Sequence, residues 1–269
     1  MNPPVRVDRD GPITLITLDA PASRHALTPQ MLCLLADAFI GFADDPQSRV
    51  AILTATGRQA FCAGGDLRST IPLLCGERPP ADHWDHRLLT DPQVLAASGL
   101  RDFPLDKPVI AAVNGACMAG GFELLLGTDL RFCADHAVFA LPEVQRGVIP
   151  FAGSMARLPR QIPHAWAMEL MLTGQPIGAA QACRIGLVNC VLPADGVLAA
   201  AREAALRIAA NAPLAVQAVK RTVRMASGLP LEDAYHAEDQ AKRFVLATED
   251  AREGPLAFIE KRAPRYVGR

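Results

Sequence analysis

Short apolar segments alternate with amphipathic ones along the first two thirds of the chain. Residues 13–18 and 50–55 are rich in β-branched and apolar side chains, which predicts two buried strands. Between them, Thr28 can cap a helix and Pro29 suits its first turn. The apolar residues of this helix fall on one face: Met31, Leu34, Leu35, Ala38, Phe39 and Phe42. A strand, a helix and a second buried strand in this order are typical of a parallel sheet, so the pattern predicts an α/β fold.

Three further apolar segments, 109–113, 130–134 and 137–140, predict more strands. The stretch 76–103 differs, because it is rich in proline, histidine and acids and is periodic only from 94 to 100. Loops of this length are usually functional or mobile. We therefore expect a loop followed by a helix, placed over a cleft.

After Pro193 the pattern becomes helical. It predicts four helices, at 197–210, 213–226, 231–247 and 255–261. The third carries apolar residues that a monomer would leave exposed: Leu231, Ala234, Ala241, Phe244 and Val245. No glycine-rich linker precedes this part. The chain therefore divides into an α/β region, 1–194, and a helical region, 195–269.

Composition excludes several classes of protein. The 269 residues are 50% hydrophobic and 20% charged with a net charge of −1, which argues against disorder and against nucleic-acid binding. The longest charge-free apolar stretch, 109–122, is too short to span a membrane, and no polybasic segment marks a membrane surface. The N-terminus does not resemble a signal peptide, and seven cysteines without a CxxC spacing indicate neither a disulfide framework nor a zinc site. We expect a cytoplasmic protein.

Two glycine turns each follow a predicted strand. The first is FCAGGDL at 61–67, and the second is NGACMAGGFE at 114–123. Glycine allows close approach of the backbone, and a helix starting near Gly120 would present free N–H groups with a positive dipole end. Each turn taken alone is equally an ordinary tight turn or helix start.

Two glutamates accompany these turns. Glu123 falls in the first turn of the predicted helix, and Glu143 follows Pro142 just after a strand. Either glutamate alone is equally an acid that complements a helix dipole. The set is more informative, because enolate chemistry needs two fixed N–H donors for a thioester oxygen and carboxylates that move protons.

These residues resemble the crotonase, or enoyl-CoA hydratase/isomerase, superfamily. The resemblance extends from about Ile13 to the C-terminus. It depends on five motifs in order: FCAGGDL at 61–67, VNGACMAGGFEL at 113–124, DLRFCADHAVFALPE at 129–143, LTGQPIGAAQACRIGLVNCVLP at 172–193 and TEDAREGPLAFIEKR at 248–262.

The resemblance implies a spiral of ββα units with a C-terminal α-helical trimerisation region that completes the coenzyme A site. It implies an acyl-CoA thioester substrate, no separate cofactor or metal, and a homotrimer or a dimer of trimers. The oxyanion hole carries over to the backbone N–H groups of Gly65 and Gly120. Glu123 and Glu143 match the pair that holds water in members that hydrate enoyl-CoA. Retention of both favours hydration of trans-2-enoyl-CoA, for example in fatty-acid β-oxidation.

Three alternatives remain within this resemblance. The first is Δ3-Δ2 enoyl-CoA isomerisation, and the second is dehydration of a specialised hydroxyacyl-CoA such as a carnitinyl thioester. The third is a non-catalytic or RNA-binding member. The absence of net positive charge argues against RNA binding, and the two retained glutamates argue against a member without activity.

The resemblance also implies contacts to coenzyme A or substrate, from Arg24, Ala26, Ala63, Asp66, Leu67, Phe258 and Lys261. Asp66 is alternatively a residue that shapes the turn. Where the family often has Pro-Gly-x-Gly-Gly, this chain has Pro150-Phe151-Ala152-Gly153-Ser154, which places Phe151 beside the expected acyl pocket and changes the surroundings of the water site. His83 and His86 lack a third ligand, so we expect no metal.

Overall fold

A computed structural model describes residues 3–269. Its larger sheet has six strands in the order β1-β2-β3-β5-β7-β10. β1 pairs with β2 antiparallel, and the remaining neighbours are parallel. The strands are β1 (Val5–Asp10), β2 (Ile13–Leu18), β3 (Val50–Ala55), β5 (Val109–Val113), β7 (Leu130–Ala134) and β10 (Cys190–Leu192). The α/β class and the parallel sheet are therefore confirmed.

A smaller sheet has the order β4-β6-β8-β9. It contains the strands that follow β3, β5 and β7, together with the short β9, which pairs antiparallel with β8. These strands are β4 (Ala60–Cys62), β6 (Ala116–Met118), β8 (Val138–Ala140) and β9 (Ile177–Gly178). The chain thus passes from the large sheet to the small one, through a helix and back again, three times. This is the spiral of ββα units that the family resemblance implied.

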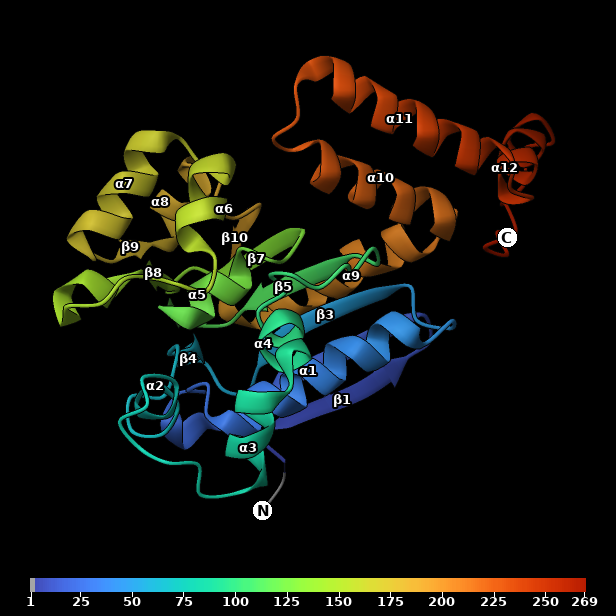
Figure 1. Cartoon of the computed structure of the whole chain (residues 1–269). Helices are drawn as coiled ribbons and strands as arrows, with labels where there is room; N and C mark the ends of the chain where they lie inside the picture. The colour runs from blue at the N-terminus through green and yellow to red at the C-terminus, as the bar shows by residue number, and fades with distance from the viewer. Residues whose placement is uncertain (1–2) are drawn as a thin grey trace.

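Helices cover the outer faces of the spiral (Figure 1). As predicted, Thr28 caps α1, since its Oγ accepts a hydrogen bond from the N–H of Met31 at 3.2 Å. The helices of the spiral are α1 (Pro29–Asp44), α2 (Thr70–Leu74), α3 (His83–Thr90), α4 (Pro92–Ser98), α5 (Gly120–Leu125), α6 (Ser154–Gln161), α7 (His164–Thr173) and α8 (Ala179–Arg184). Short 3-10 helices occur at η1 (Pro21–Ser23), η2 (Pro142–Arg146) and η3 (Ala194–Gly196).

The prediction for 76–103 is incomplete, because two helices form there. α4 corresponds to the periodic part, whereas α3 has only two inward apolar residues, Trp84 and Leu88, which pack against the core. A half-buried ion pair also holds this segment, because Arg78 donates two hydrogen bonds to Asp85. Asp82 also caps α3 by accepting from the N–H of Asp85 at 2.9 Å.

The C-terminal helices divide into two groups. α9 (Val197–Ala209) contributes buried alanines to the core and packs on the large sheet. α10 (Pro213–Ala226), α11 (Leu231–Leu246) and α12 (Asp250–Ile259) extend away from the spiral (Figure 1). α12 starts five residues before the predicted Pro255, which lies inside the helix.

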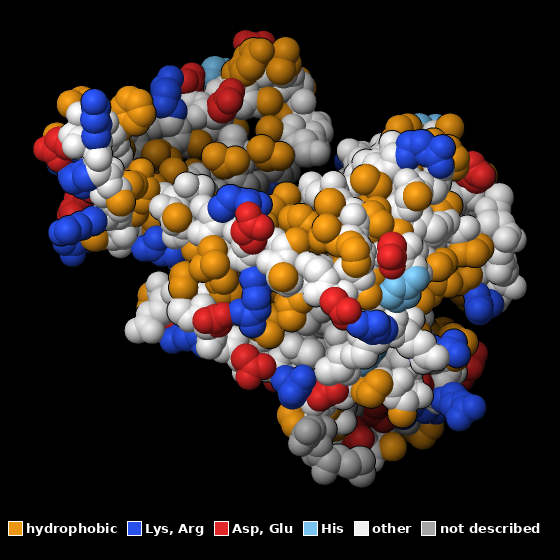
Figure 2. Space-filling model, turned by 180° about the vertical axis from the view of Figure 1, so that it is seen from behind, with side chains coloured by type: hydrophobic (Ala, Val, Ile, Leu, Met, Phe, Trp, Pro, Cys, Tyr) orange, Lys and Arg blue, Asp and Glu red, His pale blue; other side chains and the backbone are white. Residues whose placement is uncertain are grey.

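The projecting helices expose much apolar surface. None of the residues of α11 is buried, and Leu231, Phe244 and Leu246 are exposed. A groove lined by Phe103, Leu105 and Val219 separates α10 from the spiral. Viewed from behind, apolar side chains line the hollow between these helices and the body of the molecule (Figure 2).

Candidate active site

The two glycine turns meet at the junction of β4, β6 and α5. A Cβ on Gly121 would lie 2.6 Å from the Cβ of Cys62, and one on Gly64 would lie 2.6 Å from the Cβ of Ala119. Real side chains do not approach so closely. Gly64 also has a positive φ of 92°, which disfavours any other residue. The glycines are therefore needed for the two turns to pack together.

This packing brings the N–H groups of Gly65 and Gly120 to one place. A Cβ on Gly120 would lie 3.4 Å from the amide nitrogen of Gly65. In the described part of the chain, no backbone carbonyl accepts a hydrogen bond from either N–H. Ala119, just before the helix, has φ 50°, an unfavourable angle for a residue with a Cβ. Two free donors at the start of a helix form a ready site for an oxyanion.

The loop before α1 runs beside the first turn. The N–H of Ala63 donates to the carbonyl of Arg24 at 3.0 Å, and the N–H of Leu27 donates to that of Gly64 at 2.8 Å. The structure therefore brings Arg24, Ala26 and Ala63 together next to Gly65. Arg24 is exposed, with its side chain open to a ligand.

The Asp66 carboxylate stabilises the turn in which it lies. Its Oδ1 accepts from the N–H of Arg68 at 3.0 Å and from the N–H and Oγ of Ser69, each at 2.7 Å. This arrangement favours the interpretation of Asp66 as a turn residue. Leu67 is exposed beside it and free to contact a ligand.

Glu123 is buried in α5, with only 4% of its surface exposed. Its Oε1 accepts from the N–H of Ser154 at 3.1 Å and from the Oγ of Ser154 at 3.0 Å. Burial raises the pKa of Glu123, and these hydrogen bonds oppose the increase. The carboxylate form is thus partly stabilised by Ser154.

Glu143 lies in η2 and is 8% exposed. Within residues 3–269, its Oε2 has no hydrogen-bond partner. Burial, together with repulsion from the nearby Glu123, raises the pKa of Glu143 to about 7. A carboxyl group that titrates near neutral pH and carries an unpaired oxygen is suited to general acid–base catalysis.

Phe151 precedes α6 and is 50% exposed. Its carbonyl accepts a hydrogen bond from Arg101 at 3.1 Å. A half-exposed ring is not part of the core. Phe151 lies three residues before Ser154, which donates to Glu123.

Phe258 and Lys261 lie elsewhere. Phe258 is 86% exposed on α12, and α12 lies on the opposite side of the molecule from β4 and α5 (Figure 1). These two residues therefore do not reach Gly65 and Gly120 of the same chain.

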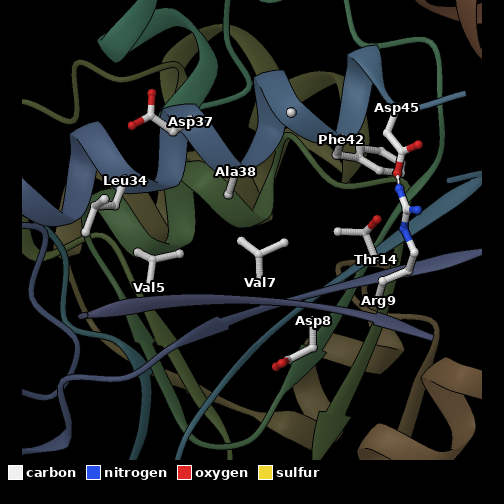
Figure 3. Close-up of a pocket in the computed structure, with 11 residues that line it drawn as sticks. Val5, Val7, Asp8, Arg9, Thr14, Leu34, Asp37, Ala38, Phe42 and Asp45 are labelled. Atoms are coloured by element: carbon white, nitrogen blue, oxygen red, sulfur yellow. Dashed lines mark ion pairs between the residues drawn. The ribbon is translucent and has the colours of Figure 1, made fainter. Parts of the chain in front are cut away.

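A separate pocket lies between β1 and α1 (Figure 3). It is lined by Val5, Val7 and Ala38, and an ion pair between Arg9 and Asp45 closes one end. No predicted site residue lines it. Across residues 3–269, no group of three histidine, cysteine or acidic side chains is placed to hold a metal, and no helix is long and apolar enough to cross a bilayer.

Two residues support the site in ways that the sequence does not indicate. Ser154 departs from the glycine pattern of the motif, and nothing in the sequence indicates its contact with Glu123. His25 is buried beneath the loop of Arg24, where its ring nitrogens contact the N–H of Ala20 and the carbonyl of Thr56, each at 3.0 Å. Burial lowers the pKa of His25, so the ring is neutral and fixes the loop.

Two buried carboxyl groups beside a pair of free amide donors, carried by a ββα spiral, define a crotonase-type enzyme. The sequence matches the enoyl-CoA hydratase/isomerase family over residues 8–269, and the chain belongs to this family.

Known proteins similar to this chain include dehydratases and hydratases of CoA thioesters. The carnitinyl-CoA dehydratases of Salmonella typhi and Escherichia coli strain K12 are 42% and 43% identical to it, and each match covers the whole of both chains. Among solved structures, an enoyl-CoA hydratase from Mycobacterium tuberculosis H37Rv is 36% identical with a TM-score of 0.88, and covers both chains completely. An enoyl-CoA hydratase from Bacillus anthracis is 34% identical with a TM-score of 0.86, over 99% of this chain and 100% of the other.

Proposed function

We propose that this protein is a hydro-lyase that interconverts a trans-2-enoyl-CoA and its 3-hydroxyacyl-CoA by addition or loss of water. One observation carries the proposal: Glu143 is buried, has an unpaired oxygen and titrates near pH 7, next to a second buried glutamate that is hydrogen-bonded. An acid and a base with different environments are what water addition across a double bond requires.

In this mechanism the thioester oxygen accepts hydrogen bonds from the N–H groups of Gly65 and Gly120. Negative charge develops on that oxygen when water attacks the β-carbon, and the two donors stabilise it. The loss of one such donor typically costs about 3–4 kcal/mol of transition-state stabilisation. The exposed residues Arg24 and Leu67, with the backbone at Ala26 and Ala63, would contact the coenzyme.

The two glutamates divide the proton transfers. Glu123 holds the water and takes its proton, while Glu143 gives its proton to the α-carbon. In dehydration each step runs backwards. These roles require that the pair carries a single proton in the active free enzyme, on Glu143. After hydration this proton lies on Glu123, and it returns to Glu143 before the next turnover.

A carnitinyl-CoA-type substrate is the second candidate, and the full-length similarity to two carnitinyl-CoA dehydratases favours it. The chemistry at the α- and β-carbons is unchanged, since that reaction is also loss of water from a 3-hydroxyacyl thioester. Such a substrate carries a trimethylammonium group, and an aromatic face stabilises such a cation by about 0.5–2 kcal/mol. Phe151 is a half-exposed aromatic ring beside the predicted acyl pocket.

We also propose that the chain assembles as a trimer or a dimer of trimers. The exposed apolar residues of α11 would be buried by a neighbouring subunit. Phe258 lies on α12, on the opposite side of the molecule from β4, so it would not contact a coenzyme bound at Gly65 of its own chain. In an assembly, Phe258 and Lys261 of one subunit would complete the coenzyme site of another.

Steady-state kinetics on four thioesters test the function: crotonyl-, hexenoyl-, decenoyl- and crotonobetainyl-CoA, followed by loss of the conjugated thioester absorbance. Hydration of the straight-chain substrates with a higher kcat/KM than crotonobetainyl-CoA supports a general hydratase. The reverse order supports the carnitinyl-type substrate. Turnover of none of the four would contradict the proposal, and turnover of a 3-enoyl-CoA in their place would favour isomerisation.

A further inference from the structure

Ser154 makes two contacts with one oxygen of Glu123. Its backbone N–H donates at 3.1 Å and its Oγ at 3.0 Å, both to Oε1. The residue is completely buried, so its hydroxyl is shielded from solvent. A serine hydroxyl is one donor with rotational freedom, and here it is directed at a carboxyl oxygen instead of a backbone carbonyl.

We propose that Ser154 is a positioning residue that holds Oε1 of Glu123, so that Oε2 alone faces the water and the shared proton of the glutamate pair rests on Glu143. The proposal depends on the hydration chemistry proposed above. It adds a residue that the motifs did not assign, at the last position of Pro150-Phe151-Ala152-Gly153-Ser154.

The geometry gives the reason. A carboxylate accepts hydrogen bonds better than a carboxylic acid does, so two donors on Oε1 favour the ionised form of Glu123. The backbone N–H of Ala152 and the charge of Arg101 act on Glu123 in the same direction, and Ser154→Ala leaves both in place. Glu143 has an unpaired Oε2 and faces the charge of Glu123, which outweighs the opposing charge of Arg146, so Glu143 binds the proton instead. Without the Ser154 hydroxyl, this difference between the two carboxyl groups becomes smaller. The same contact fixes the rotation of the carboxylate of Glu123, and therefore the direction in which Oε2 points.

Ser154→Ala removes only the hydroxyl and retains the backbone N–H. A hydrogen bond to a charged group contributes enough free energy to shift the pKa of that group by about one unit or more. Loss of the hydroxyl raises the pKa of Glu123, so the acidic limb of the kcat/KM profile should move up by about one pH unit. We expect kcat to fall about tenfold, with KM changed less than twofold. Ser154→Cys, which retains the size but is a weak donor, should fall between Ser154→Ala and the wild type.

Thr54→Val is the matched control. Thr54 is a buried hydroxyl in β3 that donates to the carbonyl of Ala112 at 2.9 Å, away from both glutamates. Its loss should lower the melting temperature and leave the pH profile in place. If Ser154 only packs at the start of α6, Ser154→Ala should behave in the same way as this control.

A direct titration separates this proposal from the proposed function. The protein is labelled with ¹³C at the glutamate Cδ, and Glu123→Gln assigns the signal of Glu123. In Ser154→Ala, Glu123 should titrate about one pH unit higher than in the wild type, whether or not any of the four thioesters is turned over. An unchanged titration of Glu123 with an unchanged pH profile would overturn the proposal. A shifted titration in a protein that turns over no thioester would retain the role of Ser154 and refute the hydratase function.

Discussion

Replacement of Glu143 by glutamine should make the folded protein more stable at alkaline pH while it removes activity. The pKa of Glu143 is raised from its ordinary value near 4.5 to about 7, first by burial and then by repulsion from Glu123. The folded state therefore holds a proton that the unfolded chain has already lost. Such a group favours folding below the unfolded pKa, and its contribution is lost as the pH rises through the folded pKa.

The size of the effect follows from the shift. Because one pKa unit corresponds to about 1.4 kcal/mol, the wild type should lose about 2–3 kcal/mol of unfolding free energy between about pH 5 and pH 8 from this residue alone. Glutamine has no charge to bury, so Glu143→Gln should not show this loss. It should also lower kcat by at least about 10²-fold, the low end for loss of general acid–base catalysis.

Urea unfolding of both proteins at about pH 5 and pH 8 measures the difference. Glu169→Gln, which removes an exposed carboxyl group on α7, serves as the control and should follow the wild type. If the stability of Glu143→Gln relative to wild type is the same at both pH values within about 0.5 kcal/mol, then Glu143 does not hold a proton in the folded state and the reasoning fails.

Other variants test the remaining assignments. Glu123→Gln should lower kcat at least about 10²-fold with little change in coenzyme A binding by calorimetry, and a near wild-type rate on all four thioesters would contradict its role. Phe151→Gly should raise kcat/KM for long enoyl-CoA relative to crotonyl-CoA, as a graded effect of about 1–3 kcal/mol per methylene. The melting temperature should change little, because the ring is half-exposed. A chain-length profile equal to that of the wild type would exclude a pocket-shaping role. Light scattering should give a trimer or hexamer, and a stable 28.7 kDa monomer at micromolar concentration would refute the assembly. In that assembly Lys261→Ala should raise KM for the thioester more than it lowers kcat, and equal binding of coenzyme A by variant and wild type would argue against its role.

The sequence was sufficient for the longer apolar strands of the large sheet. The strands at 13–18, 50–55, 109–113 and 130–134 agree with β2, β3, β5 and β7, because apolar periodicity reports burial directly. It did not indicate β1, which has polar residues at most positions and pairs on one side only. It also missed α3, which has only two inward apolar residues, Trp84 and Leu88, and is further held by the ion pair of Asp85 with Arg78.

The sequence also marked the residues of the candidate site, since glycine and glutamate stand out at the ends of apolar strands. Only the tertiary structure decided which of them meet. Gly65 and Gly120 come together because β4 and β6 are neighbours in the small sheet, and Gly121 has no side chain to hold α5 away from Cys62. Sequence spacing contains no information on that register.

The different environments of the two glutamates also came from packing. Glu123 and Glu143 look alike in the sequence, but the start of α6 brings Ser154 to one of them and leaves the other with an unpaired oxygen. The place of Phe258 is decided in the same way, because α10 carries the C-terminal helices away from the spiral. Proton affinity and position depend on neighbours distant in the chain, and a linear pattern determines only which residue types are available.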